Sequence, residues 1–438
     1  MADSPARRSL LFTASCLALI VTSMSFAIRG DIMGTLGTQF ALSKEQLGWI
    51  AGTAFWGFTV SMVIGGPLCD ALGMGRLLAF AFFAHIAGVV ITIFATGFET
   101  LFAGTLAIGL ANGMVEAACN PLVATLYPEE KTKMLNRFHV WFPGGIVIGG
   151  LVSYALGVAG LGWQVKMATM LLPAAVYGAL FFGRKFPQTE RVASGVSFGE
   201  MLAECARPLF VVLVLSMLMT AATELGPNQW IPNILTTTAG VSGILVLVWI
   251  NGLMAVGRQF AGPVVHKLSP TGMLLGSAMV AGVGLFALSH ADSAATAFGA
   301  ATLFAIGVCY FWPTMLGMTS ERLPRTGALG LAIMGGAGML SVSFVLPTMG
   351  RIYDEQTAAA LPAGATVEKL AAAASGTPEA LQWAHAQAAG GAMALRYVAV
   401  LPLVLVVIFG LVWLRDRARG GYKAEAMGTA KAAGQGGQ

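Results

Sequence analysis

The stretch LFAGTLAIGLANGMVEAACNPLVATLY, residues 101–127, decides the fold class. A bilayer-spanning helix needs about 20 mostly apolar residues, and this stretch is longer than that, with Glu116 as its only charged residue. The rest of the chain is similar, since 56% of its residues are hydrophobic, 10% are charged and the mean hydropathy is +0.76. A soluble domain carries about 25% charged residues. The chain is therefore predicted to be a polytopic membrane protein.

Other apolar stretches of similar length extend this prediction to an all-α fold. Twelve transmembrane helices are expected, at about 9–38, 46–71, 76–97, 99–127, 138–160, 163–186, 208–238, 242–266, 270–290, 294–320, 326–351 and 391–415. The first run lacks a small-residue cleavage site, so it is expected to be retained and not removed as a signal peptide.

The basic residues predict the orientation. If the N-terminus is cytoplasmic, most of the 25 Lys and Arg fall in cytoplasmic loops or tails, as the positive-inside rule requires. We therefore expect a bacterial inner-membrane protein with both termini in the cytoplasm. The net charge of +5 comes from short loops and forms no patch with aromatic residues, which argues against nucleic-acid binding. The five cysteines are scattered, and their spacing predicts no metal site, cofactor or disulfide framework.

The loops divide the chain. A polar, basic segment at 188–207 separates an N-terminal bundle at 1–187 from a C-terminal bundle at 208–415, each with six helices. Residues 353–390 are expected to form an external insertion, in which Thr377 and Pro378 mark a helix start. The tail at 416–438 is expected to be disordered and cytoplasmic, because it is rich in Gly, Ala and Lys after Arg419.

An internal repeat supports two related halves. GPLCDALGMGRLL at 66–78 has a counterpart in GPVVHKLSPTGMLL at 262–275, and the pair Ile108-Gly109 recurs as Ile306-Gly307. Parallel six-helix halves related by an axis along the membrane normal are a known transporter plan.

The first of these loops resembles the helix 2–3 signature of the major facilitator superfamily. The resemblance rests on Gly66, Asp70 and Gly73, followed by Arg76, although Met74-Gly75 stand where the family usually has basic residues. It implies a secondary transporter with two pseudo-symmetric bundles and alternating access, in which Asp70, Gly73 and Arg76 act in gating. Arg258 begins the corresponding loop of the second half and is assigned to the gate as well.

No motif predicts an enzyme. The sequence contains no GxSxG, HExxH or Walker-type nucleotide-binding pattern, and its loops are too short for an ATPase domain. Energy is therefore expected to come from an ion gradient or from the gradient of the solute.

Helix 4 carries the sharpest candidate site. Asn112, Glu116 and Asn120 are spaced i, i+4 and i+8, so they lie on one side of the helix. An ionisable residue inside the membrane is a functional candidate by default. The alternative is a structural hydrogen bond to a neighbouring helix. The segment from Glu116 to Pro121 is similar to the E-x-x-x-N-P pattern of fucose-permease-like sugar–proton symporters, which implies proton and substrate handling for Glu116 and a sugar contact for Asn120.

Helix 1 adds two charges. Arg29 and Asp31 interrupt its apolar run, and residues at i and i+2 do not face each other. Arg29 is therefore expected to pair elsewhere, with Glu116 or Glu224 as candidates. Asp31 resembles the helix 1 aspartate of the same symporters, which implies a protonation site. The alternative is a solvated residue at the outer interface.

Helix 7 places polar residues between prolines. Glu224, Asn228, Gln229 and Trp230 surround Pro227 and precede Pro232. Proline kinks helices, and interrupted helices mark binding sites in transporters. We predict substrate contacts from these four residues and from Asn251 on helix 8. An interfacial tryptophan belt is the alternative.

These features predict proton-coupled import of a monosaccharide or similar small hydroxylated solute, with Glu116 and Asp31 carrying the proton. The partners are the solute, protons and the lipid bilayer. The alternative is efflux of drugs or organic anions by proton antiport, which Arg29 favours because a cavity arginine recognises anions.

Overall fold

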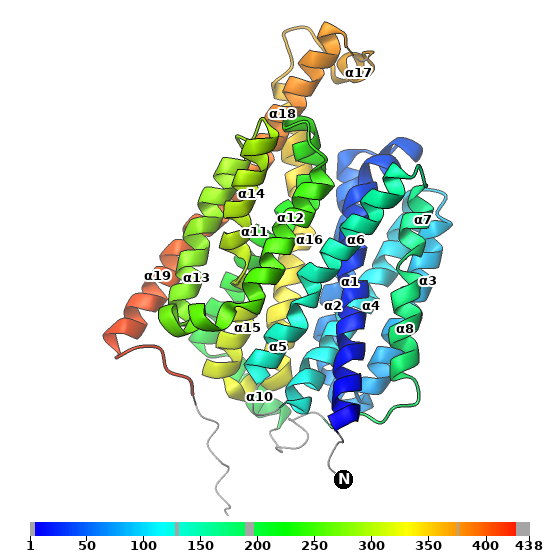
Figure 1. Cartoon of the computed structure of the whole chain (residues 1–438). Coiled ribbons are helices and arrows are strands. Elements are labelled where there is room, and N and C mark those ends of the chain that lie inside the picture. Colours follow the sequence, from blue (N-terminus) through cyan, green and yellow to red (C-terminus); the bar gives the residue numbers. More distant parts are fainter. Residues whose placement is uncertain (1–4, 128–130, 189–196, 375, 426–438) are drawn as a thin grey trace, which may run out of the picture.

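The computed structural model describes residues 5–127, 131–188, 197–374 and 376–425. Within these ranges every regular element is helical. Figure 1 shows two groups of long, roughly parallel helices, one from each half of the chain. This arrangement confirms the predicted all-α fold of two helical bundles.

In the described residues, the first bundle contains eight helices. They are α1 (Pro5–Gln39), α2 (Lys44–Leu72), α3 (Met74–Ile93), α4 (Phe98–Leu126), α5 (Lys131–His139), α6 (Trp141–Val158), α7 (Trp163–Ala168) and α8 (Leu171–Phe181). A short helix, α10 (Phe198–Cys205), lies between the bundles in the sequence.

The second bundle follows. It comprises α11 (Pro208–Thr238), α12 (Gly243–Gln259), α13 (Ala261–Leu288), α14 (Ala294–Val308), α15 (Phe311–Arg322), the 3₁₀ turn η1 (Pro324–Thr326), α16 (Gly327–Ala359), α17 (Val367–Ala371), α18 (Pro378–Val398) and α19 (Val400–Ala418).

The count of spans agrees with twelve. In the described ranges, 11 helical stretches are long and apolar enough to cross a membrane, and the shorter apolar helix Gly243–Gln259 supplies one more. Each predicted span coincides with a helix or with two consecutive helices.

Five predicted single helices are divided in two, at α5–α6, α7–α8, α12–α13, α14–α15 and α18–α19. A proline stands in the first turn after each division, at positions 143, 173, 263, 313 and 402. Proline removes a backbone donor and clashes with the carbonyl four residues earlier, which explains where the helices divide. By contrast α11 continues through Pro227 and Pro232, so the interruption expected there is absent.

Local signals position the turns. Ser43 and Gln46 form a capping box at the start of α2, which satisfies free backbone donors. Gly73 joins α2 to α3 with φ +86°, a conformation that glycine adopts at little cost. Thr377 caps α18 by accepting from the Ala380 amide, which confirms the predicted helix start there.

Small residues let α4 approach α2 closely. A Cβ atom on Gly109 would lie 2.3 Å from the Ala54 carbonyl oxygen, and one on Gly113 would lie 2.3 Å from that of Phe58. Such contacts are typical of membrane helix pairs. They hold α4, and therefore Glu116, in a fixed place in the bundle.

Candidate functional site

A small cavity lies where the two bundles meet. Its volume is about 10 Å³, room for about one water molecule. Ionisable side chains from four helices line it: Glu116 of α4, His139 of α5, Glu224 of α11 and Arg258 of α12. We call these four residues the central cluster.

Glu116 is buried and bonded within its own half. The Asn120 amide donates to Glu116 Oε2 at 2.7 Å, and His139 Nε2 lies 3.0 Å from Asn120 Oδ1 and 3.9 Å from Glu116 Oε2. Because Asn120 Oδ1 is an acceptor, His139 Nε2 carries the hydrogen of this bond. The side chain of Glu116 therefore faces a small cavity lined by ionisable and apolar side chains, and not lipid or bulk solvent. His139 is part of this group although the sequence analysis did not select it.

Glu224 already has a cationic partner. Arg258 Nη2 lies 3.0 Å from Glu224 Oε1, and Arg258 Nε donates to the Cys309 carbonyl at 2.8 Å. Both side chains are buried. Arg258, predicted from its loop position to act in gating, thus lies in the central cluster.

Arg29 has a different environment from the one predicted. Its guanidinium is buried, donates to Gln229 Oε1 at 3.2 Å and packs over the rings of Phe26 and Phe55 at 4.9 and 5.6 Å. Among the described residues no carboxylate pairs with it, and its Nε has no hydrogen-bond partner. The expected pairing with Glu116 or Glu224 is therefore wrong, because those side chains bond Asn120 and Arg258.

Asp31 lies outside the central cluster. Its Oδ2 accepts from Lys166 Nζ at 2.7 Å and from Ser153 Oγ at 2.6 Å. It lines a second cavity of about 200 Å³, together with Gln229 and Trp230. Asp31 is thus an ion-paired residue of this second cavity, a state that neither sequence-based alternative described.

Asn112 and Trp230 point away from the central cluster. Asn112 bonds His85 Nε2 at 2.8 Å and Ser25 Oγ at 3.1 Å, inside the first bundle. Each step of four residues rotates a helix position by about 40°, so Asn112 faces α3 although it shares a side with Glu116. Trp230 Nε1 donates to the Leu346 carbonyl at 3.2 Å, which ties α11 to α16.

Asn228 and Asn251, which were predicted to contact the substrate, form hydrogen bonds inside the second bundle. Asn228 donates to the Glu224 carbonyl at 2.8 Å, and Asn251 donates to Asn228 Oδ1 at 3.4 Å and to the Leu247 carbonyl at 2.9 Å. These bonds use much of the hydrogen-bonding capacity of the Asn228 and Asn251 side chains within the protein.

The predicted gate residues of the first loop lie at the α2–α3 turn. Gly73 forms the turn and Arg76 is exposed in the first turn of α3. Asp70 belongs to α2, but its side chain lies outside what the structure describes. In the described part of the chain, no group of three or more His, Cys, Asp and Glu residues could hold a metal ion.

Comparisons with known proteins agree with this architecture. The family model of the Major Facilitator Superfamily matches residues 11–347. The two helical bundles and this match define a membrane transporter of the secondary type, and the chain belongs to the Major Facilitator Superfamily. It is therefore a transporter and not an enzyme.

Individual relatives are distant. The chain is 24% identical over 300 residues to the hexuronate transporter of Bacillus subtilis, covering 63% of this chain and 70% of the relative. It is 25% identical over 403 residues to the gallate transporter of Pseudomonas putida, covering 78% and 87%. A crystal structure of the E. coli fucose:proton symporter superposes with a TM-score of 0.63 at 16% identity, covering 91% of this chain and 98% of that one. The last likeness confirms the fold.

Proposed function

We propose that this transporter imports a small hydroxylated organic anion, such as a sugar acid, together with a proton. The observation that carries the proposal is Arg29, a buried cation that has no carboxylate partner among the described residues. The monosaccharide predicted from the sequence stays a prediction, and the proposal adds a carboxylate to it.

The electrostatics of Arg29 support an anionic solute. Burial of an unpaired charge costs several kcal/mol, and the ring faces of Phe26 and Phe55 offset only ~1–2 kcal/mol of that cost. Its planar guanidinium can bind a carboxylate through two parallel hydrogen bonds. The Nε that lacks a partner would supply one of these bonds.

The contact of Arg29 with Gln229 supports an anion site between the bundles. Arg29 belongs to α1 and Gln229 to α11, so a solute that binds Arg29 would replace a contact between the two halves. Gln229 also lines the 200 Å³ cavity, where its amide could bind a hydroxyl group. Solute binding would thereby bias the relative position of the halves.

The relatives point to the same chemistry. Hexuronate and gallate, the solutes named for two relatives, each combine one carboxylate with several hydroxyl groups. A site with one arginine and neutral amides is suited to that combination.

Glu116 is the proposed proton carrier. Of the two carboxylates in the central cluster, Glu224 is paired with Arg258 whereas Glu116 bonds the neutral amide of Asn120. Burial disfavours a charge that no cation compensates, so Glu116 is the one that can exchange a proton as the cavity opens to either side. We assign no proton to Asp31, because Lys166 pairs with it.

Uptake into proteoliposomes tests the proposal. Labelled hexuronate, gallate and a neutral hexose are offered with and without an inward proton gradient. We expect accumulation of at least one acid that depends on the gradient, and little uptake of the hexose. Acid uptake that does not depend on the proton gradient would contradict proton coupling. Preference for the hexose would contradict carboxylate binding by Arg29 and would favour the neutral monosaccharide predicted from the sequence.

The predicted alternative, efflux by antiport, is distinguished in the same vesicles. Preloaded acid should leave faster when the proton gradient is inward if antiport is correct. We expect the opposite, since a symporter then retains its solute.

A further inference from the structure

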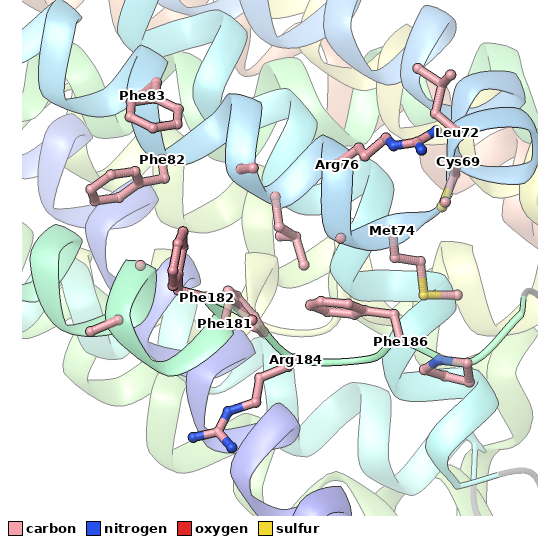
Figure 2. A pocket seen from close by; sticks show the side chains of 18 of the residues that line it. Cys69, Leu72, Met74, Arg76, Phe82, Phe83, Phe181, Phe182, Arg184 and Phe186 are labelled. Carbon is pink, nitrogen blue, oxygen red and sulfur yellow. The ribbon is translucent and has the colours of Figure 1, made fainter.

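A large groove lies on the first bundle, apart from the central cluster (Figure 2). Its volume is about 1030 Å³, and it is bounded by the α2–α3 turn, α3, α8 and the segment after α8. Arg7 near the start of α1 contacts the carbonyl of Lys185 just beyond α8. The groove therefore opens on the side of the molecule where α1 begins, which the charge distribution predicts to be cytoplasmic.

The wall of the groove is aromatic and faces outward. Phe82, Phe83, Phe181, Phe182 and Phe186 line it. The exposed fraction is 68% for Phe83 and 87% for Phe182, large values for phenylalanine. In a membrane protein such side chains are covered by lipid.

Small residues leave the space between these rings. Ala175 and Ala179 are exposed, lie one turn apart on α8 and line the groove with Gly178. A Cβ atom on Gly178 would lie 2.5 Å from the Phe82 ring. The groove of about 1030 Å³ is lined mostly by apolar side chains, which suits an acyl chain.

The rim of the groove is basic. Arg76 and Arg184 border it and are exposed, and none of its described lining residues is Asp or Glu. Figure 2 shows these two arginines on opposite sides of the aromatic wall. Lys185 follows Arg184 directly in the sequence. Basic pockets at the cytoplasmic ends of membrane helices attract anionic lipid headgroups.

We propose that this groove binds an anionic phospholipid of the cytoplasmic leaflet. The acyl chain lies along the phenylalanines, and the negatively charged headgroup lies at the basic rim, to which Arg76 and Arg184 attract it from opposite sides of the aromatic wall. The apolar wall requires a lipid, since inorganic phosphate would leave it uncovered. The basic rim selects a negative headgroup over a zwitterionic one.

Native mass spectrometry of the purified full chain tests the site. Phosphatidylglycerol and phosphatidylcholine with identical acyl chains are added in detergent, and the lipid that each variant retains is counted. The wild type should retain phosphatidylglycerol in preference. Arg76→Gln with Arg184→Gln should lower that retention about 30-fold, the scale expected for two surface cations.

Two variants separate a specific site from general charge attraction. Ala179→Trp fills the groove without changing its charge and should also lower retention. Arg415→Gln removes an exposed cation at the end of α19 and should leave retention unchanged. Size-exclusion profiles establish whether each variant is folded. If the double arginine variant is not folded, lipid retention by Ala179→Trp alone tests whether the groove binds the lipid.

Several results would overturn the proposal. Equal retention of the two lipids would contradict the headgroup preference. If Arg415→Gln lost as much phosphatidylglycerol as the double arginine variant, the preference would reflect net charge and not a site. Full retention in Ala179→Trp would place the acyl chain elsewhere. Displacement of the lipid by inorganic phosphate would indicate a phosphate site.

Discussion

At the scale of single residues, the two most informative side chains are Glu116 and Arg29, because their environments differ. Glu116 accepts a hydrogen bond from the neutral amide of Asn120, and Arg29 has one neutral partner and two aromatic rings. In the proposed function, Glu116 exchanges the proton and Arg29 binds the carboxylate of the solute.

Glu116→Gln should abolish accumulation against a gradient while exchange of solute across the membrane continues. Glutamine keeps the shape and the bond partner of Glu116 but does not titrate. Uphill uptake and counterflow are measured in the same proteoliposomes. Accumulation at the wild-type level would clear Glu116 of the proton role.

Arg29→Gln should raise KM for an acid about 10- to 100-fold, the range for losing a charge-assisted hydrogen bond. Arg29→Lys should recover part of this loss, since lysine keeps the charge but not the planar fork. Initial uptake rates give KM. An equal loss for a neutral hexose in both variants would indicate a packing role instead.

The candidate site could be predicted in part. Intramembrane charge selected Glu116, Glu224 and Arg29 because such residues are rare in apolar runs. Their partners could not be predicted, because Arg29 meets Gln229, 200 positions away in the sequence, and no local pattern encodes that contact. His139, the last residue of α5, could not be selected from the sequence, because a lone histidine near a predicted loop is more often a packing residue than a ligand.

At the scale of helices, the contact between α2 and α4 has no room for a larger residue. Gly113→Ala should lower the free energy of unfolding by about 1–3 kcal/mol, the usual cost of overpacking. Gly276→Ala is the control, since its added Cβ would meet nothing within 4 Å. Thermal unfolding in detergent compares them. Equal stability of the two variants would show that α2 and α4 can separate without cost.

The segment after α19 docks on the second bundle, although a disordered tail was expected there. Arg207 binds both oxygens of Glu425, at 2.8 and 2.9 Å, and the Tyr422 hydroxyl donates to Glu321 at 2.7 Å. The hydrogen bonds from Arg207 hold the pKa of the Glu425 carboxyl below its usual range. The residues from 426 onward lie outside the described ranges.

This attachment should depend on pH. A lowered pKa in the docked state means that docking is favoured above about pH 4, the ordinary pKa of glutamate, and is lost as pH falls through the lowered value. A spin label at Ala424→Cys in a Cys205→Ser background should be restrained at pH 7 and mobile near pH 3. Arg207→Gln should release it at both. Constant mobility would contradict the assignment.

The helices themselves were largely predictable from apolar runs of bilayer length. The positions at which helices divide were not predictable, because proline follows a helix end at some positions of this chain and lies within a continuous helix at others. Pro143 and Pro313 follow helix ends, whereas Pro227 and Pro232 lie within the continuous α11. Packing by neighbouring helices decides which outcome holds, and that packing is a property of the whole fold.

At the scale of the whole molecule, α2 and α16 join the two bundles. The Trp56 and Phe344 rings lie 4.8 Å apart, and a Cβ atom on Gly52 would lie 3.4 Å from the Ser343 carbonyl oxygen. A short thiol cross-linker between Gly52→Cys and Ser343→Cys should stop transport by preventing movement between the halves. Uptake with a reducible linker, before and after reduction, checks this. Full activity of the cross-linked protein would exclude movement at this interface.

The length of α16 has a practical consequence. Its 33 residues extend about 50 Å at 1.5 Å per residue, whereas the hydrocarbon core is about 30 Å thick. Its last turns, with α17 and the start of α18, are therefore expected to project beyond the bilayer. Figure 1 shows α17 and the start of α18 at the top of the molecule, beyond the ends of the other helices. An epitope tag inserted near Gly364 should bind antibody on intact spheroplasts, whereas a tag at the C-terminus should bind only after the membrane is permeabilised. The reverse pattern would invert the assigned orientation.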